Sequence, residues 1–204
     1  AAYLNTQNRA VTRQDYISAV YAMPGKFGAI KRCTIFRDND SFKRNLNLYV
    51  LSENEEGHLV NPSNTLKLNL KTWLNNVRMI NDTIDILNGF VINIGIDYQI
   101  VVDENANRFE ALRKSSLAIE ELFTVQKEMG EPIYLSDYFK ALKDVDEILD
   151  VVDIKLINKS GAPYSELSFD VDANTSPDGR VITPPRIAIF ELKYPEIDIR
   201  GTII

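Results

Sequence analysis

A short helix-to-strand unit occurs twice in this chain, and this repetition constrains the fold more than any other feature. Residues 12–20 (TRQDYISAV) lead into an apolar run from Ile30, and residues 136–142 (SDYFKAL) lead into the run 151–157. Each copy places a hydroxyl residue at the expected helix N-cap, then Asp-Tyr-x-x-Ala, then a turn before a strand. A unit that is used twice is typical of a scaffold, and neither copy contains a catalytic motif.

The composition is that of an ordinary folded chain. Its 204 residues are 45% hydrophobic and 25% charged, enough to bury a core in one or two domains. The single cysteine, Cys33, excludes an internal disulfide and suits a reducing cytoplasm. No apolar run is long enough for a membrane helix, and the chain opens without a signal peptide or a Met. We therefore expect it to be a piece of a longer protein.

Periodicity predicts both helices and strands. Thr12 and Asp15 form a capping-box start for a helix over residues 13–23. An amphipathic helix is predicted around Trp73 from the spacing of Leu66, Leu70, Trp73, Leu74 and Val77. Alternation over residues 90–102 predicts a strand with one buried face. A long helix at 107–128 and a helix in the second repeat are also predicted, with strands at 30–36, 46–51, 83–86, 151–157, 167–171 and 187–192.

These elements predict an α+β fold with mixed or antiparallel sheets and packed amphipathic helices, built from repeated helix-strand units. Residues 1–104 would form a first module, in which the alternating strand completes a β-α-β-β arrangement around the Trp73 helix. Residues 105–204 would form a second module with the long helix, the second repeat and the C-terminal strands.

No catalytic arrangement can be assembled from these residues. His58 is the only histidine and follows a polar turn, so we expect it in a surface loop rather than in a triad. Cys33 lies in an apolar strand pattern and is expected in the core. One Cys and one His exclude a structural zinc site within this chain. We predict a protein that is not an enzyme and uses neither cofactor nor metal.

Two acidic runs resemble metal sites but have simpler interpretations. Residues 170–174 (DVDAN) begin like a calcium loop, yet Thr175 stands where glycine is needed and Val181 where glutamate is needed. We predict a strand end and a hairpin loop there. Asp38 and Asp40 could share a divalent ion, although Asp-Asn-Asp between two strands is also a good turn.

Charge is divided unevenly along the chain. Residues 1–50 carry eight Lys/Arg and three Asp/Glu, a net charge of +5, and the remainder carries −11. Such a split can attract a partner or further copies head to tail, although charged runs are also often solvated faces. The acidic total argues against nucleic acid. The candidate interface residues are basic on one subunit (Arg9, Arg13, Lys31, Arg32, Lys43, Arg44) and acidic on another (Glu120, Glu121, Asp144, Asp146, Glu147, Asp150).

Several features, in a fixed order, resemble a known family. They are the helix opening at 12–16, its Pro24-Gly25 stop, residues 73–78 (WLNNVR) with Asp82 ahead of a strand, and the alternating segment 90–102. Together they resemble the baseplate J-like proteins of contractile phage tails. More closely, the chain is similar to the C-terminal part of the baseplate wedge protein of T-even-like bacteriophages. The resemblance covers most of the chain, including the second repeat and the closing residues 196–201 (EIDIRG).

The resemblance implies a structural, non-enzymatic subunit. Wedge proteins assemble with neighbouring wedge proteins and join around the tail hub into a ring that rearranges on contraction. The chain would then belong to the tail baseplate of a virion that assembles in the host cytoplasm. Its partners would be other wedge proteins and copies of itself, with no membrane contact, and the helical core of the wedge would lie upstream of Ala1.

Two other classes of function stay open. A metal-dependent hydrolase would use Asp38, Asp40 or the acids near Asp170, and would bind a divalent ion tightly. A receptor- or glycan-binding module would present exposed aromatic side chains together in a groove. The candidate aromatics are scattered along the sequence, at Tyr3, Tyr21, Tyr164 and Tyr194.

Overall fold

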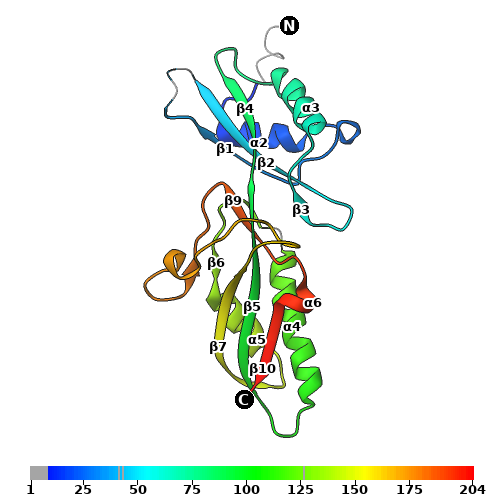
Figure 1. Ribbon diagram of the computed structural model, residues 1–204, viewed down its shortest axis with the longest axis vertical. Coiled ribbons are helices and arrows are strands. Elements are labelled where there is room, and N and C mark those ends of the chain that lie inside the picture. Colours follow the sequence, from blue (N-terminus) through cyan, green and yellow to red (C-terminus); the bar gives the residue numbers. More distant parts are fainter. Residues whose placement is uncertain (1–8, 41, 43, 126) are drawn as a thin grey trace. The chain divides into compact units, whose positions relative to one another are not determined.

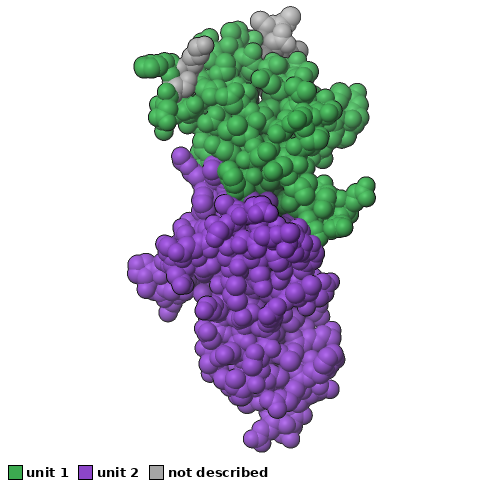
Figure 2. Space-filling view, in the orientation of Figure 1, with its two compact units in different colours: residues 1–90 green, residues 91–204 purple. Residues whose placement is uncertain are grey.

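The computed structural model divides into two compact units, residues 1–90 and 91–204, which Figure 2 colours separately. It describes residues 9–204 except 41, 43 and 126. Each unit has its own sheet and helices (Figure 1). Each also has its own cluster of buried apolar side chains. Helices and mixed sheets both contribute, so the predicted α+β class is confirmed.

The sheet of the first unit is built on strand β2 (Asn45–Glu53). β1 (Arg32–Arg37) is antiparallel to β2, and β4 (Thr83–Asn88) is parallel to it on the opposite side. The short β3 (Leu59–Val60) pairs with the end of β2. Helix α3 (Asn64–Asn75) connects β2 to β4, which gives the β-α-β part of the predicted arrangement.

Helices α2 (Arg13–Tyr21) and α3 cover one face of this sheet. On the strands, cross-strand neighbours such as Ile35 and Leu48 are almost fully buried. The same cluster takes in Cys33, as predicted, and four helix side chains at helical spacing: Tyr16, Val20, Leu70 and Leu74. The core of the first unit therefore lies between this helix pair and one sheet face.

Helix α2 begins with the predicted capping box. Thr12 Oγ1 accepts a hydrogen bond from the Asp15 amide at 3.1 Å, and the Asp15 carboxylate accepts from the Thr12 amide at 2.8 Å. Backbone N–H groups of Thr12 and then Val11, donating to this carboxylate, lower the pKa of Asp15. The helix ends at Tyr21, two residues before the predicted end, and a 3-10 turn (Gly25–Phe27) follows.

The sheet of the second unit is centred on strand β5 (Phe90–Val102). β10 (Ile199–Ile203) is parallel to β5, β7 (Ile148–Lys159) is antiparallel to it, and β9 (Ala188–Glu191) also pairs with it. One face of β5 buries Ile92, Ile94, Ile96, Tyr98 and Ile100, as predicted. The other face is only partly open, because Asn93 and Gly95 are buried as well.

Helices α4 (Arg108–Thr124) and α5 (Leu135–Lys143) pack against this apolar face. Their buried side chains include Ile119, Tyr138 and Leu142. A one-turn helix, α6 (Pro195–Asp198), leads directly into β10. The small strands β6 (Ile133–Tyr134) and β8 (Val181–Ile182) form a separate two-stranded sheet.

The boundary between the units lies at residues 90 and 91, not at the predicted 104 and 105. Strand β5 follows β4 after a single residue, Gly89, which is why the sequence placed both strands in one module. Within the described part of the chain, however, β5 pairs only with strands of the second unit. The last strand of the predicted β-α-β-β arrangement, β5, therefore belongs to the second sheet, because its hydrogen-bonded partners are there.

One predicted strand is absent from the structure. Residues 167–171 are irregular, and a 3-10 turn (Asp172–Asn174) stands where a hairpin loop was predicted. The amide of Phe169 donates to the side-chain oxygen of Asn158 at 2.9 Å. A side chain of β7 thus satisfies a backbone donor that a neighbouring strand would otherwise bind.

The two copies of the repeat share their packing but differ at the cap. The Tyr of each copy and the residue four positions later are buried: Tyr16 with Val20, and Tyr138 with Leu142. Ser136, however, lies inside α5 and is not its N-cap, because β6 runs straight into the helix and leaves Tyr134 at the cap position. The predicted hydroxyl cap is therefore correct for the first copy and wrong for the second.

Gly201 offers a test of the packing between β10 and β5. It pairs with Tyr98, and a Cβ there would overlap the Tyr98 ring and lie 2.8 Å from Leu112. We predict that Gly201→Ala lowers the free energy of unfolding of the second unit by about 1–3 kcal/mol. Urea titration followed by the amide NMR signals of β5 measures this. Gly25→Ala is the control, with no atom within 4 Å of the added Cβ. Equal stability of both variants would contradict the packing described here.

Candidate functional site

The basic candidate residues have different surroundings. Arg9 is exposed, and Lys31 forms an ion pair with Glu53 at 2.9 Å. Arg32 is buried and donates from Nη1 to the carbonyl oxygen of Lys31 at 2.6 Å. Lys43 lies outside the described residues. These residues are therefore not equivalent members of one charged surface.

The remaining two candidates, Arg13 and Arg44, line one pocket of about 240 Å³, which we call the arginine pocket. A third arginine, Arg37, completes the set and was missed by sequence analysis. The strand register carries the signal for it, because Arg37 lies on the same face of β1 as Ile35, two residues earlier, and opposite Leu46 of β2. The other lining residues are Val11, Thr12, Tyr16, Ile35, Phe36, Leu46 and Asp82.

Arg13 reaches from α2 across the edge of β1. Its Nε donates to the carbonyl oxygen of Ile35 at 2.9 Å, and its Nη2 donates to Thr34 Oγ1 at 2.7 Å. The guanidinium lies 5.1 Å from the ring centroid of Phe36. Arg13 therefore satisfies a strand carbonyl at the edge of the sheet while its charge stays at the pocket.

Asp82 is a buried carboxylate of the arginine pocket, with only 4% of the residue exposed. Its Oδ2 accepts a hydrogen bond from the Tyr16 hydroxyl at 2.7 Å, and its Oδ1 lies 3.2 Å from Arg44 Nε. The Tyr16 hydroxyl also accepts from the Met79 amide at 3.2 Å. Burial, with the hydrogen bond to Asp82, raises the pKa of Tyr16 to about 12, so this hydroxyl stays a donor at neutral pH.

We predict that Tyr16→Phe destabilises the first unit by about 1–3 kcal/mol, because it removes a donor from the buried Asp82 and an acceptor from the Met79 amide. The fluorescence of Trp73, the only tryptophan, reports unfolding of this unit in denaturant. Tyr49→Phe is the matched control, since the Tyr49 hydroxyl has no hydrogen bond to the described residues. A similar small effect of both changes would show that the Tyr16 contacts contribute little.

The acidic candidates belong to three elements of the second unit. Glu120 and Glu121 lie on α4, and Asp150 lies on β7. The loop between α5 and β7 carries the rest: Asp144, Asp146 and Glu147. All but Glu120 and Glu147 are exposed.

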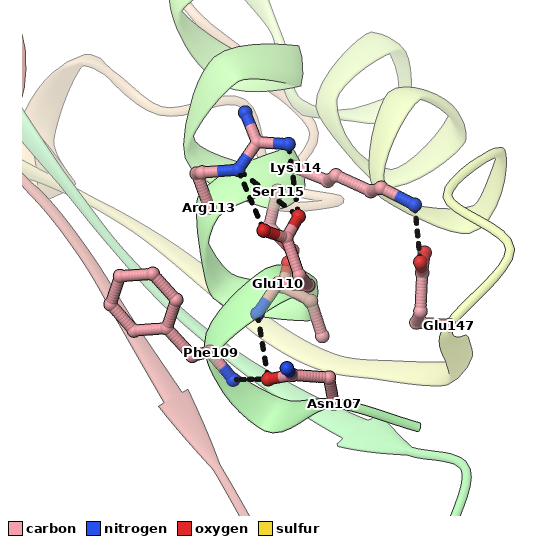
Figure 3. A network of polar contacts seen from close by, with 8 residues as sticks. Asn107, Phe109, Glu110, Arg113, Lys114, Ser115 and Glu147 are labelled. Atoms are coloured by element: carbon pink, nitrogen blue, oxygen red, sulfur yellow. Dashed lines mark hydrogen bonds and ion pairs between the residues drawn. The ribbon is translucent and has the colours of Figure 1, made fainter. Parts of the chain in front are cut away.

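Glu147 already has an ion-pair partner within the chain. Lys114 reaches from α4 to the Glu147 carboxylate and forms an ion pair with it (Figure 3). The hydrogen bond from Lys114 lowers the pKa of Glu147. Close by, Arg113 binds Glu110 at 2.9 Å, and the Asn107 side chain caps α4 through the amides of Phe109 and Glu110 (Figure 3). The pair with Lys114 ties the acidic loop to α4.

Because the pKa of Glu147 is lowered in the folded state, its pair stabilises the fold above the ordinary glutamate pKa and is lost as pH falls through the lowered value. We predict that Lys114→Met raises the pKa of Glu147 toward its ordinary value. A pH titration of the Glu147 side chain by NMR measures it. Arg113→Met is the control and should change the pKa less, because Arg113 bonds to Glu110 instead. An unchanged pKa in Lys114→Met would contradict the ion pair.

The acidic runs considered as metal sites serve local turns. Asp38 Oδ1 accepts from the Asp40 amide at 3.1 Å, and Asp170 Oδ1 accepts from the Ala173 amide at 3.0 Å. Across the described residues, no three His, Cys, Asp or Glu side chains gather as they would around a metal ion. His58 lies in the turn before β3, with its side chain 17% exposed, so it is more buried than predicted.

Two of the tyrosines that looked scattered lie together. The rings of Tyr164 and Tyr194 meet edge to face, with centroids 5.7 Å apart. Both residues are half-buried, and the Tyr164 hydroxyl donates to the buried Asp198 at 2.7 Å. The Tyr21 hydroxyl accepts from the Cys33 amide at 3.1 Å, and Tyr3 lies outside the described residues. The hydroxyls of Tyr164 and Tyr21 thus form hydrogen bonds within the chain and do not line an open aromatic groove.

Comparison with known proteins gives one kind of match. No protein-family description matches the chain, and no curated protein is detectably similar to it in sequence. Its fold resembles that of a baseplate chain. The similar structure is described as "Cryo-EM structure of the anti-feeding prophage (AFP) baseplate, 6-fold symmetrised". The TM-score is 0.54 at 12% identity, and the match covers 94% of this chain and 40% of that chain.

At this identity the likeness to the AFP baseplate chain shows a shared fold. The match takes in both units, since it extends over nearly the whole of this chain. This chain spans less than half of the AFP chain. None of the helices in the described residues is both long and apolar enough to cross a bilayer.

Proposed function

We propose that this chain is a structural component of the baseplate of a contractile tail. The observation that carries the proposal is the fold shared with an AFP baseplate chain over 94% of this sequence. The order of helix, turn and strand signals that resembles baseplate J-like proteins supports it independently. Both arguments point to baseplate proteins, so the role proposed is one of assembly rather than catalysis.

Within the baseplate, we assign the chain to the wedge. This finer assignment rests on the resemblance to the wedge protein of T-even-like bacteriophages. Its partners are other wedge proteins and copies of itself, which assemble in the host cytoplasm and end in the virion tail. The exposed basic and acidic side chains are the surfaces through which such contacts form, since charge complementarity selects partners and aligns them.

The proposal predicts that the chain occurs in purified contractile-tail particles at a fixed copy number. A multiple of six is expected, because the AFP baseplate with the similar chain is described as 6-fold symmetrised. Quantitative mass spectrometry of the particles measures this, and tagging the chain for electron microscopy locates it. Disrupting its gene should leave particles without complete baseplates, and the restored gene is the control. Intact baseplates in the disrupted strain would refute the proposal.

A further inference from the structure

The arginine pocket contains guanidinium N–H donors that the described residues do not use. Arg13 uses Nε and Nη2, and Arg44 uses Nε in its pair with Asp82. Arg37 is exposed, and its side chain makes no hydrogen bond or ion pair with any described residue. A guanidinium has more donors than these bonds occupy. Three guanidinium groups therefore line one pocket with donors to spare.

The charge of the pocket is positive. Asp82 is the acidic residue of its lining, and Tyr16 and Arg44 already bind both of its oxygens. A further carboxylate suits the remaining donors, because a guanidinium binds a carboxylate through two parallel hydrogen bonds. The pocket also has an apolar wall of Val11, Ile35, Phe36 and Leu46. The ligand it fits is an acidic side chain beside an apolar one.

The second unit presents such a combination. Asp146 and Asp150 are exposed, and between them Leu149 exposes 63% of its surface. The ion pair of Glu147 with Lys114 holds this segment against α4 before any partner binds, which lowers the entropic cost of association. The charges of the units are also opposite, because residues 1–90 carry a net +3 and residues 91–204 a net −9.

We propose that the arginine pocket receives segment 144–150 of a second copy of the chain. The carboxylates of Asp146 and Asp150 face Arg13, Arg37 and Arg44, and Leu149 packs on the apolar wall. Two different surfaces meet in this contact, so it is heterologous and can close a ring of copies. The inference deepens the proposed function and rests on it, because copies of a baseplate subunit can be joined into a ring through a contact of this kind.

Light scattering after size exclusion tests the contact with the full chain, over a range of protein concentrations at low and high salt. Arg37→Glu changes the pocket without removing an internal bond, whereas Arg13 and Arg44 support the fold. Asp146→Lys changes the other surface. The controls are Lys71→Glu and Glu166→Lys, which carry the same charge changes. Both residues are exposed, and their side chains form no hydrogen bond or ion pair with the described residues. Thermal unfolding checks that every variant is folded.

We expect the wild-type chain to associate at low salt and to dissociate at high salt. Arg37→Glu and Asp146→Lys should each weaken association by about tenfold or more, and the two controls should not. An equimolar mixture of Arg37→Glu and Asp146→Lys should associate again, because each variant supplies the surface that the other lacks.

A wild-type chain that stays monomeric at every concentration would overturn the inference, and so would an Arg37→Glu variant that associates like Lys71→Glu. Failure of the mixture to associate would overturn the pairing of these two surfaces. These outcomes are separate from those of the particle experiment. A chain that is present in tail particles but shows no self-association keeps the proposed function and loses this contact.

Discussion

The open edge of strand β1 is the constraint on which the arrangement of the arginine pocket depends. Among the described strands, β1 pairs only with β2, so its other side has backbone groups that need partners. Two side chains of α2 supply them: Arg13 donates to Ile35, and the Tyr21 hydroxyl accepts from Cys33. These bonds hold both ends of α2 along the strand. The same placement brings Tyr16 to Asp82 and leaves the arginines around one pocket.

The structure separates charges that support the fold from charges that are free to bind a partner. Asp82 is buried, and such a carboxylate is tolerated because Tyr16 and Arg44 bind it. Lys114 and Glu147 likewise neutralise each other and fix a loop. The Arg37 and Asp146 side chains form no hydrogen bond or ion pair with the described residues, although Asp146 also acts electrostatically on Lys114. The net charge of a segment therefore overstates how many of its charged side chains can bind a partner. That number depends on which of the side chains are already paired within the chain.

Local sequence signals predicted the elements well, and long-range pairing was where they failed. The capping box at Thr12 and the alternation along β5 depend on neighbouring residues, so the sequence contains all the information needed. Arg37 was missed because its place in a pocket depends on its register with Leu46 of another strand. The unit boundary was misplaced for the same reason, since the partners of β5 lie mostly more than fifty residues away.

The two copies of the helix-to-strand repeat pack alike, but only the first contributes to a charged pocket. Tyr16 and Tyr138 occupy the same position in their helices and are equally buried. Burial raises the pKa of both hydroxyls, but only that of Tyr16 has a buried carboxylate to bind, and the Tyr138 hydroxyl has no partner within the described chain. The Asp-Tyr-x-x-Ala pattern thus specifies a helix that buries a tyrosine against a sheet. Arg13 of the same helix, together with Asp82, Arg37 and Arg44 from outside it, makes the first copy part of the wall of a charged pocket, and the second copy stays part of the core.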